Sequence, residues 1–166
     1  MFSRILVPTD FSPPSDAAME YARLLAVTFG ASLHLLHVID DPAASTAFVA
    51  DGYAPSTSEI RELTLKEART RLEQRMSAAD RLRFRVSTDA LIGVPAVAIV
   101  DYAFATGASL IVMGTHGRSG LAHLLMGSVA EHVVRTATCP VLTVRQVPAQ
   151  VDLTANVSES TIPISA

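Results

Sequence analysis

The residues best suited to binding a ligand lie in one glycine-rich stretch, GTHGRSGLAHLLMGSVAEHVV, which begins at Gly114. The stretch follows an apolar run typical of a buried strand and ends in a pattern typical of a helix. Glycines let backbone amides approach phosphate oxygens closely, and the first N–H groups of a helix, with the helix dipole, favour an anion. The sequence therefore predicts a loop that binds a polyphosphate.

The spacing of these glycines is more informative than their presence. Gly114 and Gly117 enclose two residues, and after nine more comes Gly127, next to Ser128. Two glycines three apart serve many tight turns, whereas the longer pattern also requires a strand before it and a helix after it. Ser128 offers its hydroxyl to a phosphate and is equally suited to cap the helix. Arg118, the cation of the loop, is either a partner for a phosphate or an exposed charge.

The elements that position this loop follow from alternating apolar runs and helix signals. Short runs of Ile, Leu and Val, closed by Pro, Asp or Gly, indicate buried strands. Stretches of helical period with prolines at their starts and glycines at their ends indicate helices. The expected strands span residues 5–7, 33–39, 84–90, 110–113 and 141–144. The expected helices span residues 12–29, 58–76, 95–106 and 128–136.

This alternation predicts an α/β fold: one doubly wound, five-stranded parallel sheet, Rossmann-like, in the strand order 3-2-1-4-5. In that order the first and fourth strands are neighbours whose crossover helices lie on opposite faces, so a crevice opens beyond their carboxyl ends. The loop after the first strand must then meet the loop after the fourth. We therefore expect Pro8, Thr9 and Asp10 to lie beside Gly114.

Two segments and the end of the chain have further patterns. The helix over 58–76 is amphipathic, and its apolar stripe consists of Ile60, Leu63, Ala68, Leu72 and Met76. Apolar and polar residues alternate over 84–90, which indicates a strand at a sheet edge with one wet side. Residues 1–146 are expected to form one domain, and residues 147–166, which have no sustained period, a flexible tail.

The composition limits the classes of function. The 166 residues suit a single domain, and a formal charge of -3 without a basic cluster argues against nucleic acid or anionic lipid as a partner. No apolar run approaches the roughly 20 residues of a membrane span, and the N-terminal run is too short for a secretory signal. The single cysteine, Cys139, cannot form an intramolecular disulfide. We therefore expect a cytoplasmic protein.

The pattern as a whole resembles the ATP-binding branch of the universal stress proteins. The resemblance rests on the glycine spacing, on VMGTHGRSG at its start, on CPVLTV after it, and on the first strand with its ILVPTD sequence. It extends through Val144, nearly the whole chain before the tail. It implies ATP as the ligand, and a Mg²⁺ ion could be carried by the phosphates, with water completing its shell.

The resemblance also assigns residues to this ligand. It implies that Asp10 and its neighbours Pro8 and Thr9 contact the nucleoside, and that the backbone of Val38 pairs with adenine. The remaining implied residues line the ribose and phosphates or lie in the loop beside them: Met113, Gly114, His116, Gly117, Arg118, Gly127, Ser128 and Val129.

Several of these residues have other possible roles. Asp10 is also suited to cap a turn or the first helix, because aspartate is favoured at both positions. His116 is equally consistent with a loop residue that makes no ligand contact. His37 is better explained as a packed residue at a strand end than as a metal ligand, and no other histidine has a partner at zinc-binding spacing. The sequence therefore predicts no metal site.

The sequence lacks the residues and motifs that a phosphoryl-transfer enzyme uses. A phosphoryl-transfer enzyme places a lysine on the phosphates and carboxylates on magnesium. The only lysine, Lys66, lies in the amphipathic helix, and the Walker and kinase motifs are absent. We therefore expect no catalytic residues, with slow hydrolysis left open. A hydrolase or transferase acting on adenylated substrates would need a nucleophile or base that the sequence does not offer.

Two function hypotheses remain. The first is a nucleotide-binding sensor or regulator, and the resemblance implies a role in stress response. The alternative is a dimeric interaction scaffold that has the fold and does not use nucleotide. Strand 141–144 would lie at a sheet edge, and pairing with the same strand of a second copy covers such an edge. We therefore expect a homodimer through 141–144, unless the tail after Gln146 folds over this edge.

Overall fold

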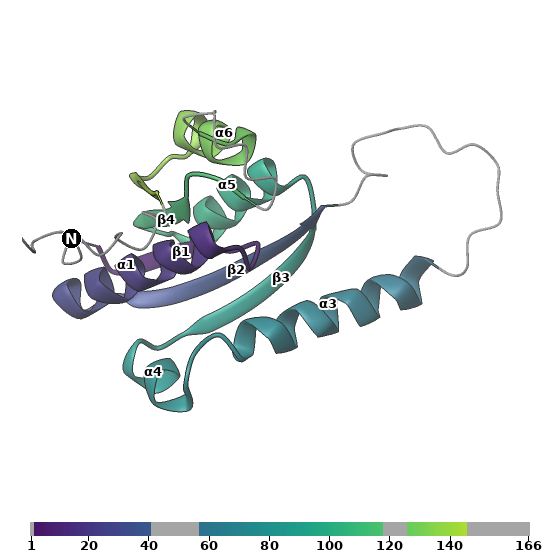
Figure 1. Ribbon diagram of the computed structural model, residues 1–166, viewed down its shortest axis with the longest axis horizontal. Helices are drawn as coiled ribbons and strands as arrows, with labels where there is room; N and C mark the ends of the chain where they lie inside the picture. The colour runs from purple at the N-terminus through teal and green to yellow at the C-terminus, as the bar shows by residue number, and fades with distance from the viewer. Residues whose placement is uncertain (1, 41–56, 118–125, 146–166) are drawn as a thin grey trace, which may run out of the picture.

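The computed structural model describes residues 2–40, 57–117 and 126–145 and contains a five-stranded parallel sheet in the order β3-β2-β1-β4-β5 (Figure 1). The strands are β1 (Arg4–Pro8), β2 (Ser32–Asp40), β3 (Ser87–Gly93), β4 (Leu110–Gly114) and β5 (Val141–Val144). The helices are α1 (Pro13–Phe29), α3 (Thr57–Glu73), α4 (Ala78–Arg83), α5 (Pro95–Thr106) and α6 (Ser128–Thr136). The predicted fold class and strand order are confirmed. Within the described ranges, no helix has the length and apolarity to cross a membrane.

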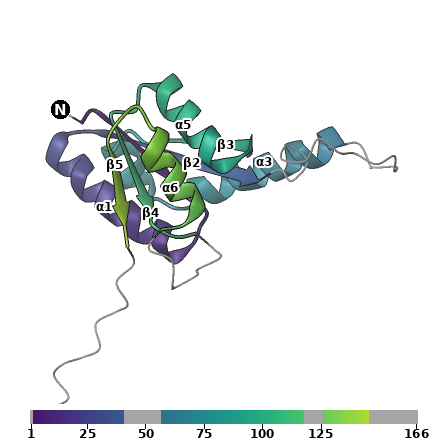
Figure 2. The same ribbon diagram turned by 90° about the horizontal axis from the view of Figure 1, so that it is seen from above.

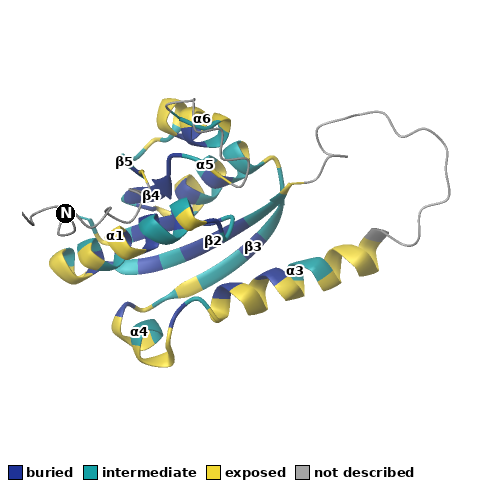
Figure 3. Ribbon diagram, viewed as in Figure 1, coloured by how far each residue is buried: buried dark blue, intermediate teal, exposed yellow. Residues whose placement is uncertain are grey.

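Alternating side chains of the strands form a core on each face of the sheet. Ile5 and Val7 of β1 pack with residues of α1 and α3, whereas Leu6 packs with residues of α5 and α6. Figure 1 shows α5 and α6 on the opposite side of the sheet from α3, and Figure 3 shows buried strands between these layers. The crossover helices of β1 and β4 therefore lie on opposite faces, as expected, and a crevice is available at the carboxyl ends of these strands.

Helix α1 begins and ends where its sequence signals predict. Ser12 is extended (φ -86°, ψ 159°), prolines occupy the first turn, and Gly30 ends the helix in the left-handed conformation (φ 65°). The small residues Ala18, Ala22 and Ala26 are buried on its inner face. Because this face allows close packing, the start of α1 lies directly beside the end of β4, with a tight approach between Pro14 and Gly114.

The strand predicted over 84–90 is wrong in its position. The structure has β3 over Ser87–Gly93 and, before it, the unpredicted short helix α4. The hydroxyl of Ser77 caps α4 by accepting from the backbone N–H of Asp80 at 3.1 Å, and Phe84 is buried at the other end of the helix. The apolar alternation thus included Phe84, which faces the core from a helix end. The expectation of an edge strand is confirmed, since β3 is the outer strand beside β2.

The apolar stripe predicted for the long helix is only half buried. Ala68, Leu72 and Met76 belong to the core, whereas Ile60 is 52% and Leu63 is 67% exposed. Helix α3 ends at Glu73, so Met76 lies in the turn that follows it. Its first half extends away from the sheet (Figures 1 and 2), and helical periodicity alone could not show where this packing ends.

Candidate functional site

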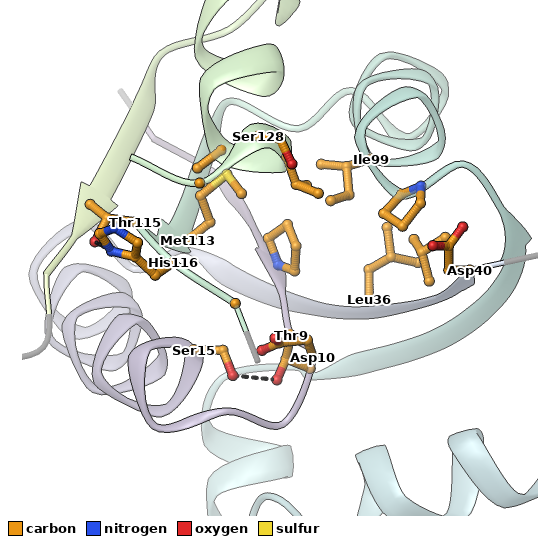
Figure 4. Close-up of a pocket in the computed structure, with 18 residues that line it drawn as sticks. Thr9, Asp10, Ser15, Leu36, Asp40, Ile99, Met113, Thr115, His116 and Ser128 are labelled. Atoms are coloured by element: carbon orange, nitrogen blue, oxygen red, sulfur yellow. Dashed lines mark hydrogen bonds between the residues drawn. The ribbon is translucent and has the colours of Figure 1, made fainter. Parts of the chain in front are cut away.

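A cavity of about 360 Å³ opens where β1, β2 and β4 end and α1, α5 and α6 begin (Figure 4). All the predicted binding residues except Arg118 line it, and Arg118 lies outside the described residues. The predicted residues brought together here are Pro8, Thr9, Asp10, Val38, Met113, Gly114, His116, Gly117, Gly127, Ser128 and Val129. The spacing argument and the strand order therefore lead to one place in the fold.

Other lining residues were not predicted. They are Ser15, Leu36, Asp40, Pro95, Ile99, Thr115 and Ala130. Thr115 and Ala130 stand next to predicted residues in the glycine-rich stretch. Pro95 and Ile99 belong to α5, which reaches the cavity because β3 pairs with β2 and places the start of α5 beside the end of β2. Their one sequence signal was position, in the helix that directly follows the strand paired with β2.

The turn between β1 and α1 is held by its own polar groups. The backbone N–H of Thr9 donates to the carbonyl of Leu36 at 2.8 Å, and the hydroxyls of Thr9 and Ser15 lie 2.9 Å apart (Figure 4). Oδ1 of Asp10 accepts from the backbone N–H of Ser12 at 3.1 Å and from the Ser12 hydroxyl. Asp10 therefore closes this turn as well as lining the cavity, and Ser12, rather than Asp10, occupies the N-cap of α1.

The two loops predicted to meet are in contact. A Cβ atom added to Gly117 would lie 2.9 Å from Oδ2 of Asp10, so the backbone at Gly117 rests against this carboxylate. The far end of the glycine-rich loop returns to its start, because the N–H of Gly127 donates to the carbonyl of Thr115 at 2.7 Å. The lining residues of the loop are thus positioned by β1 on one side and by α6 on the other.

Gly114 has a structural reason to be glycine. A Cβ atom at this position would lie 2.9 Å from the carbonyl carbon of Pro14 and 3.0 Å from its oxygen. Real Cβ atoms essentially never approach backbone so closely, so the first turn of α1 packs against β4 only because residue 114 has no side chain. The glycine pattern therefore serves helix packing at Gly114 in addition to lining the cavity.

Helix α6 begins at the cavity. Its N-cap is Gly127 in an extended conformation (φ -74°, ψ 155°) without a side-chain cap, and Ser128 is its first residue. The alternative role of Ser128 as the helix cap is therefore wrong. The first N–H groups of a helix have no partner within it, and they carry the positive end of the helix dipole. These groups give this part of the cavity a partial positive charge, which favours an anion.

The two ends of the cavity differ in chemistry. Leu36, Ile99 and Asp40 lie together at one end, and Thr115 and His116 lie at the other (Figure 4). Nδ1 of His116 lies 3.0 Å from the Thr115 hydroxyl. The described lining residues include the carboxylates Asp10 and Asp40 and no lysine or arginine. An anion bound to these residues would therefore depend on backbone N–H groups, hydroxyls and any cation that it carries.

Two other groups, the lysine and the cysteine of the described ranges, do not line this cavity. Lys66 is on α3, and Cys139 packs against the core beneath α5 and α6. Burial raises the pKa of the Cys139 thiol and so opposes the reactive thiolate. Among residues 2–40, 57–117 and 126–145, no cluster of three or more His, Cys, Asp or Glu could hold a metal ion.

The similarity to known proteins extends over all the residues that the structure describes. The model of the universal stress protein family matches residues 1–145. Universal stress protein MJ0531 of Methanocaldococcus jannaschii is 37% identical over 146 residues, which cover 88% of this chain and 84% of that protein.

Solved structures show the same likeness. That of MJ0577 from Methanocaldococcus jannaschii has a TM-score of 0.76 and 29% identity, with 90% of this chain and 99% of that chain covered. A universal stress protein solved in complex with cAMP has a TM-score of 0.53 and 26% identity over 87% of this chain and 97% of its own. With fold, glycine spacing and sequence in agreement, the chain belongs to the universal stress protein family.

Proposed function

We propose that this protein is a cytoplasmic stress-response sensor or regulator that binds ATP in the cavity at the carboxyl ends of β1, β2 and β4. One observation carries the proposal: residues selected by glycine spacing and strand order line a single cavity. Its volume, about 360 Å³, is within the range of cavities that hold small molecules. A family member of the same fold was solved with cAMP, which is also an adenine nucleotide.

The chemistry of the cavity supports one orientation of the nucleotide. The adenine ring would lie against Leu36, Val38 and Ile99, where apolar side chains cover a flat ring. The phosphates would lie at the start of α6, near Ser128, where helix N–H groups meet them. A Mg²⁺ ion would arrive on the phosphates, since the described lining residues offer no lysine or arginine to offset their charge.

Binding without rapid turnover follows from the same residues. Lys66 lies on α3 and does not line the cavity. No described residue therefore plays the part that the phosphate-binding lysine has in kinases and P-loop proteins. A protein of this kind responds to nucleotide through a difference in shape or partner affinity between its bound and empty states.

Calorimetric titration of the nucleotide-stripped protein with MgATP tests the proposal. We expect micromolar binding of MgATP and measurable binding of cAMP, with GTP binding at least about tenfold weaker if the apolar end recognises adenine. Adenosine serves as the control for the base end alone. Absence of heat with all three adenine ligands would reject the nucleotide proposal and leave the interaction scaffold as the remaining hypothesis.

A homodimer through β5 is part of both hypotheses. Strand β5 is an outer strand of the sheet beside β4 (Figure 2), and Leu142 on it is 38% exposed. We expect the mass of two chains in sedimentation at micromolar concentration, and a shift towards one chain in Leu142→Lys, because a lysine on an edge strand opposes pairing. Phe104→Lys, a change at an exposed residue of α5, is the control and should stay dimeric. A wild-type mass of one chain would contradict this prediction.

A further inference from the structure

Phe11, directly after Asp10, has a backbone conformation that bulky residues disfavour. Its φ is 64°, and among the described residues Arg85 is the other non-glycine residue with positive φ. In this conformation the Cβ atom of an L-residue crowds the following carbonyl oxygen, so glycine would fit at no cost. Such strain persists only where the surrounding structure holds the residue in place, and it is most frequent at functional sites.

Two elements hold the ring of Phe11. The guanidinium carbon of Arg71 on α3 lies 4.0 Å from the ring centroid, within the range of a cation–π interaction. The ring of His37 on β2 also contacts the Phe11 ring, with centroids 4.5 Å apart and the planes at 44°. Phe11 itself does not line the cavity and packs against the core between the sheet and α1 and α3. Its side chain is therefore clamped between α3 and the sheet.

The turn that contains Phe11 presents two cavity residues. The N–H of Phe11 donates to Oγ1 of Thr9 at 3.0 Å, and Nδ1 of His37 lies 2.7 Å from the carbonyl oxygen of Thr9. A carbonyl only accepts, so this His37 nitrogen carries the proton and donates. His37, a neighbour of the ring, and the backbone N–H of Phe11 itself thus both fix Thr9, the residue two positions before Phe11.

The same turn sets the carboxylate of Asp10. Oδ1 accepts from Ser12, and Oδ2 faces the backbone of Gly117 across the two loops. Since Asp10 and Ser12 flank Phe11, any change in the backbone of Phe11 moves both ends of this hydrogen bond. Asp10 would then lose its position against Gly117. The β1 loop and the glycine-rich loop are therefore connected through one strained residue.

We propose that Phe11 is a positioning residue of the nucleotide site: clamped between Arg71 and His37, it holds Thr9 and Asp10 in the arrangement that binds the ligand. This inference rests on the proposed function, because it takes the cavity as the nucleotide site. It adds a link between that site and α3, since Arg71 contacts the ring and Arg75, just after α3, forms an ion pair with Asp16 of α1. By reciprocity, a ligand that needs this turn also stabilises the contact of α3 with it.

Three variants of Phe11 and a control separate positioning from simple core packing. Phe11→Ala should weaken MgATP binding about tenfold, within the usual range of coupling between linked groups. Phe11→Tyr, which keeps the ring, should bind as the wild type does. Phe11→Gly should melt above Phe11→Ala because glycine accepts this φ, and yet bind no better. Phe29→Ala is the structural control, since Phe29 packs against the same core and pairs with Phe2 at the other end of α1. It should lower the melting temperature and leave the Kd unchanged.

The contribution of α3 has its own matched pair. Arg71→Ala should weaken MgATP binding about 2- to 5-fold, as expected for an exposed cation–π contact. Arg69→Ala removes an arginine of the same helix whose partner is Asp89, 3.7 Å away, and should bind as the wild type does. Equal Kd values for Phe11→Ala, Phe29→Ala and the wild type would overturn the positioning role.

A readout without ligand keeps this inference distinct from the proposed function. In amide NMR spectra of the ligand-free protein, Phe11→Ala should shift the signals of Thr9 and Gly117, whereas Phe29→Ala should leave both in place. Unchanged Thr9 and Gly117 signals in Phe11→Ala would overturn the inference even if MgATP binds. Shifted signals in a protein that binds no adenine ligand would uphold the linkage of the two loops and reject the nucleotide proposal alone.

Discussion

Replacing Ser128 with glutamate is expected to abolish most MgATP binding without harming the fold. Ser128 is the first residue of α6, where a carboxylate interacts favourably with the helix dipole. The same carboxylate would stand among the phosphates of a nucleotide bound at the start of α6. Repulsion between the introduced carboxylate and neighbouring phosphates, partly screened by water, should weaken MgATP binding by about 10- to 100-fold. The melting temperature of Ser128→Glu should equal or exceed that of the wild type.

Adenosine is the informative second ligand for Ser128→Glu. It has no phosphates, so its affinity should change by less than about twofold between the wild type and the variant. The loss for MgATP should also shrink at high salt, because mobile ions screen the repulsion at an exposed site. Comparable losses for both ligands would mean that the variant disturbs the whole cavity rather than its phosphate end.

His132→Glu is the matched control for this charge. It adds the same charge at an exposed position of α6, four residues further along and about 6 Å further from the start of the helix. We expect its MgATP affinity to stay close to that of the wild type. If Ser128→Glu and His132→Glu both bind MgATP as the wild type does, the phosphates do not lie at the start of α6, and the proposed orientation is wrong.

The sequence predicted the cavity well where topology determines the geometry. Asp10 and Gly117 are far apart in the chain, yet both follow strands that neighbour each other in the order 3-2-1-4-5. Once that order is known, the carboxyl ends of β1 and β4 must share one edge of the sheet. Residue types then sufficed, because glycines and a serine between a strand and a helix have few common uses other than turns and anion binding.

Prediction failed where the packing of side chains decides the outcome. Ile99 is an ordinary apolar residue of α5, and only the pairing of β3 with β2 brings its helix to the cavity. Phe84 continued an apolar alternation, but it ends a helix of six residues, too short to establish a helical period. The strain at Phe11 has no sequence signal either, since a positive φ at a bulky residue is set by its neighbours in space.

At Gly114, the sequence predicted one role and the packing of the structure shows another. Its place in the glycine spacing indicates close approach of a phosphate, and its surroundings show close approach of the Pro14 backbone. The two roles are compatible, and spacing cannot distinguish between them. A variant at this position that loses nucleotide binding would therefore not identify the loop as the binding site, because loss of the packing between α1 and β4 gives the same result.

Gly114→Ala is accordingly expected to destabilise the protein before it affects any ligand. The new Cβ atom would lie 2.9 Å from a backbone carbon of Pro14, so α1 or β4 must shift. Overpacking of this kind costs about 1–3 kcal/mol, which lowers the melting temperature of a chain of this length by roughly 2–12 °C. Thermal unfolding of the ligand-free protein measures the effect with no assumption about nucleotide.

Gly93→Ala provides the matched comparison for Gly114→Ala. Gly93 also ends a strand, has no positive φ, and would place its Cβ atom 4.0 Å from that of Ala98, an ordinary contact. Its melting temperature should stay within about 2 °C of the wild-type value. If Gly114→Ala melted as Gly93→Ala does, α1 would be free to move away from β4 at no cost. The glycine at 114 would then be explained by the ligand rather than by the fold, because the tight contact with Pro14 would no longer require it.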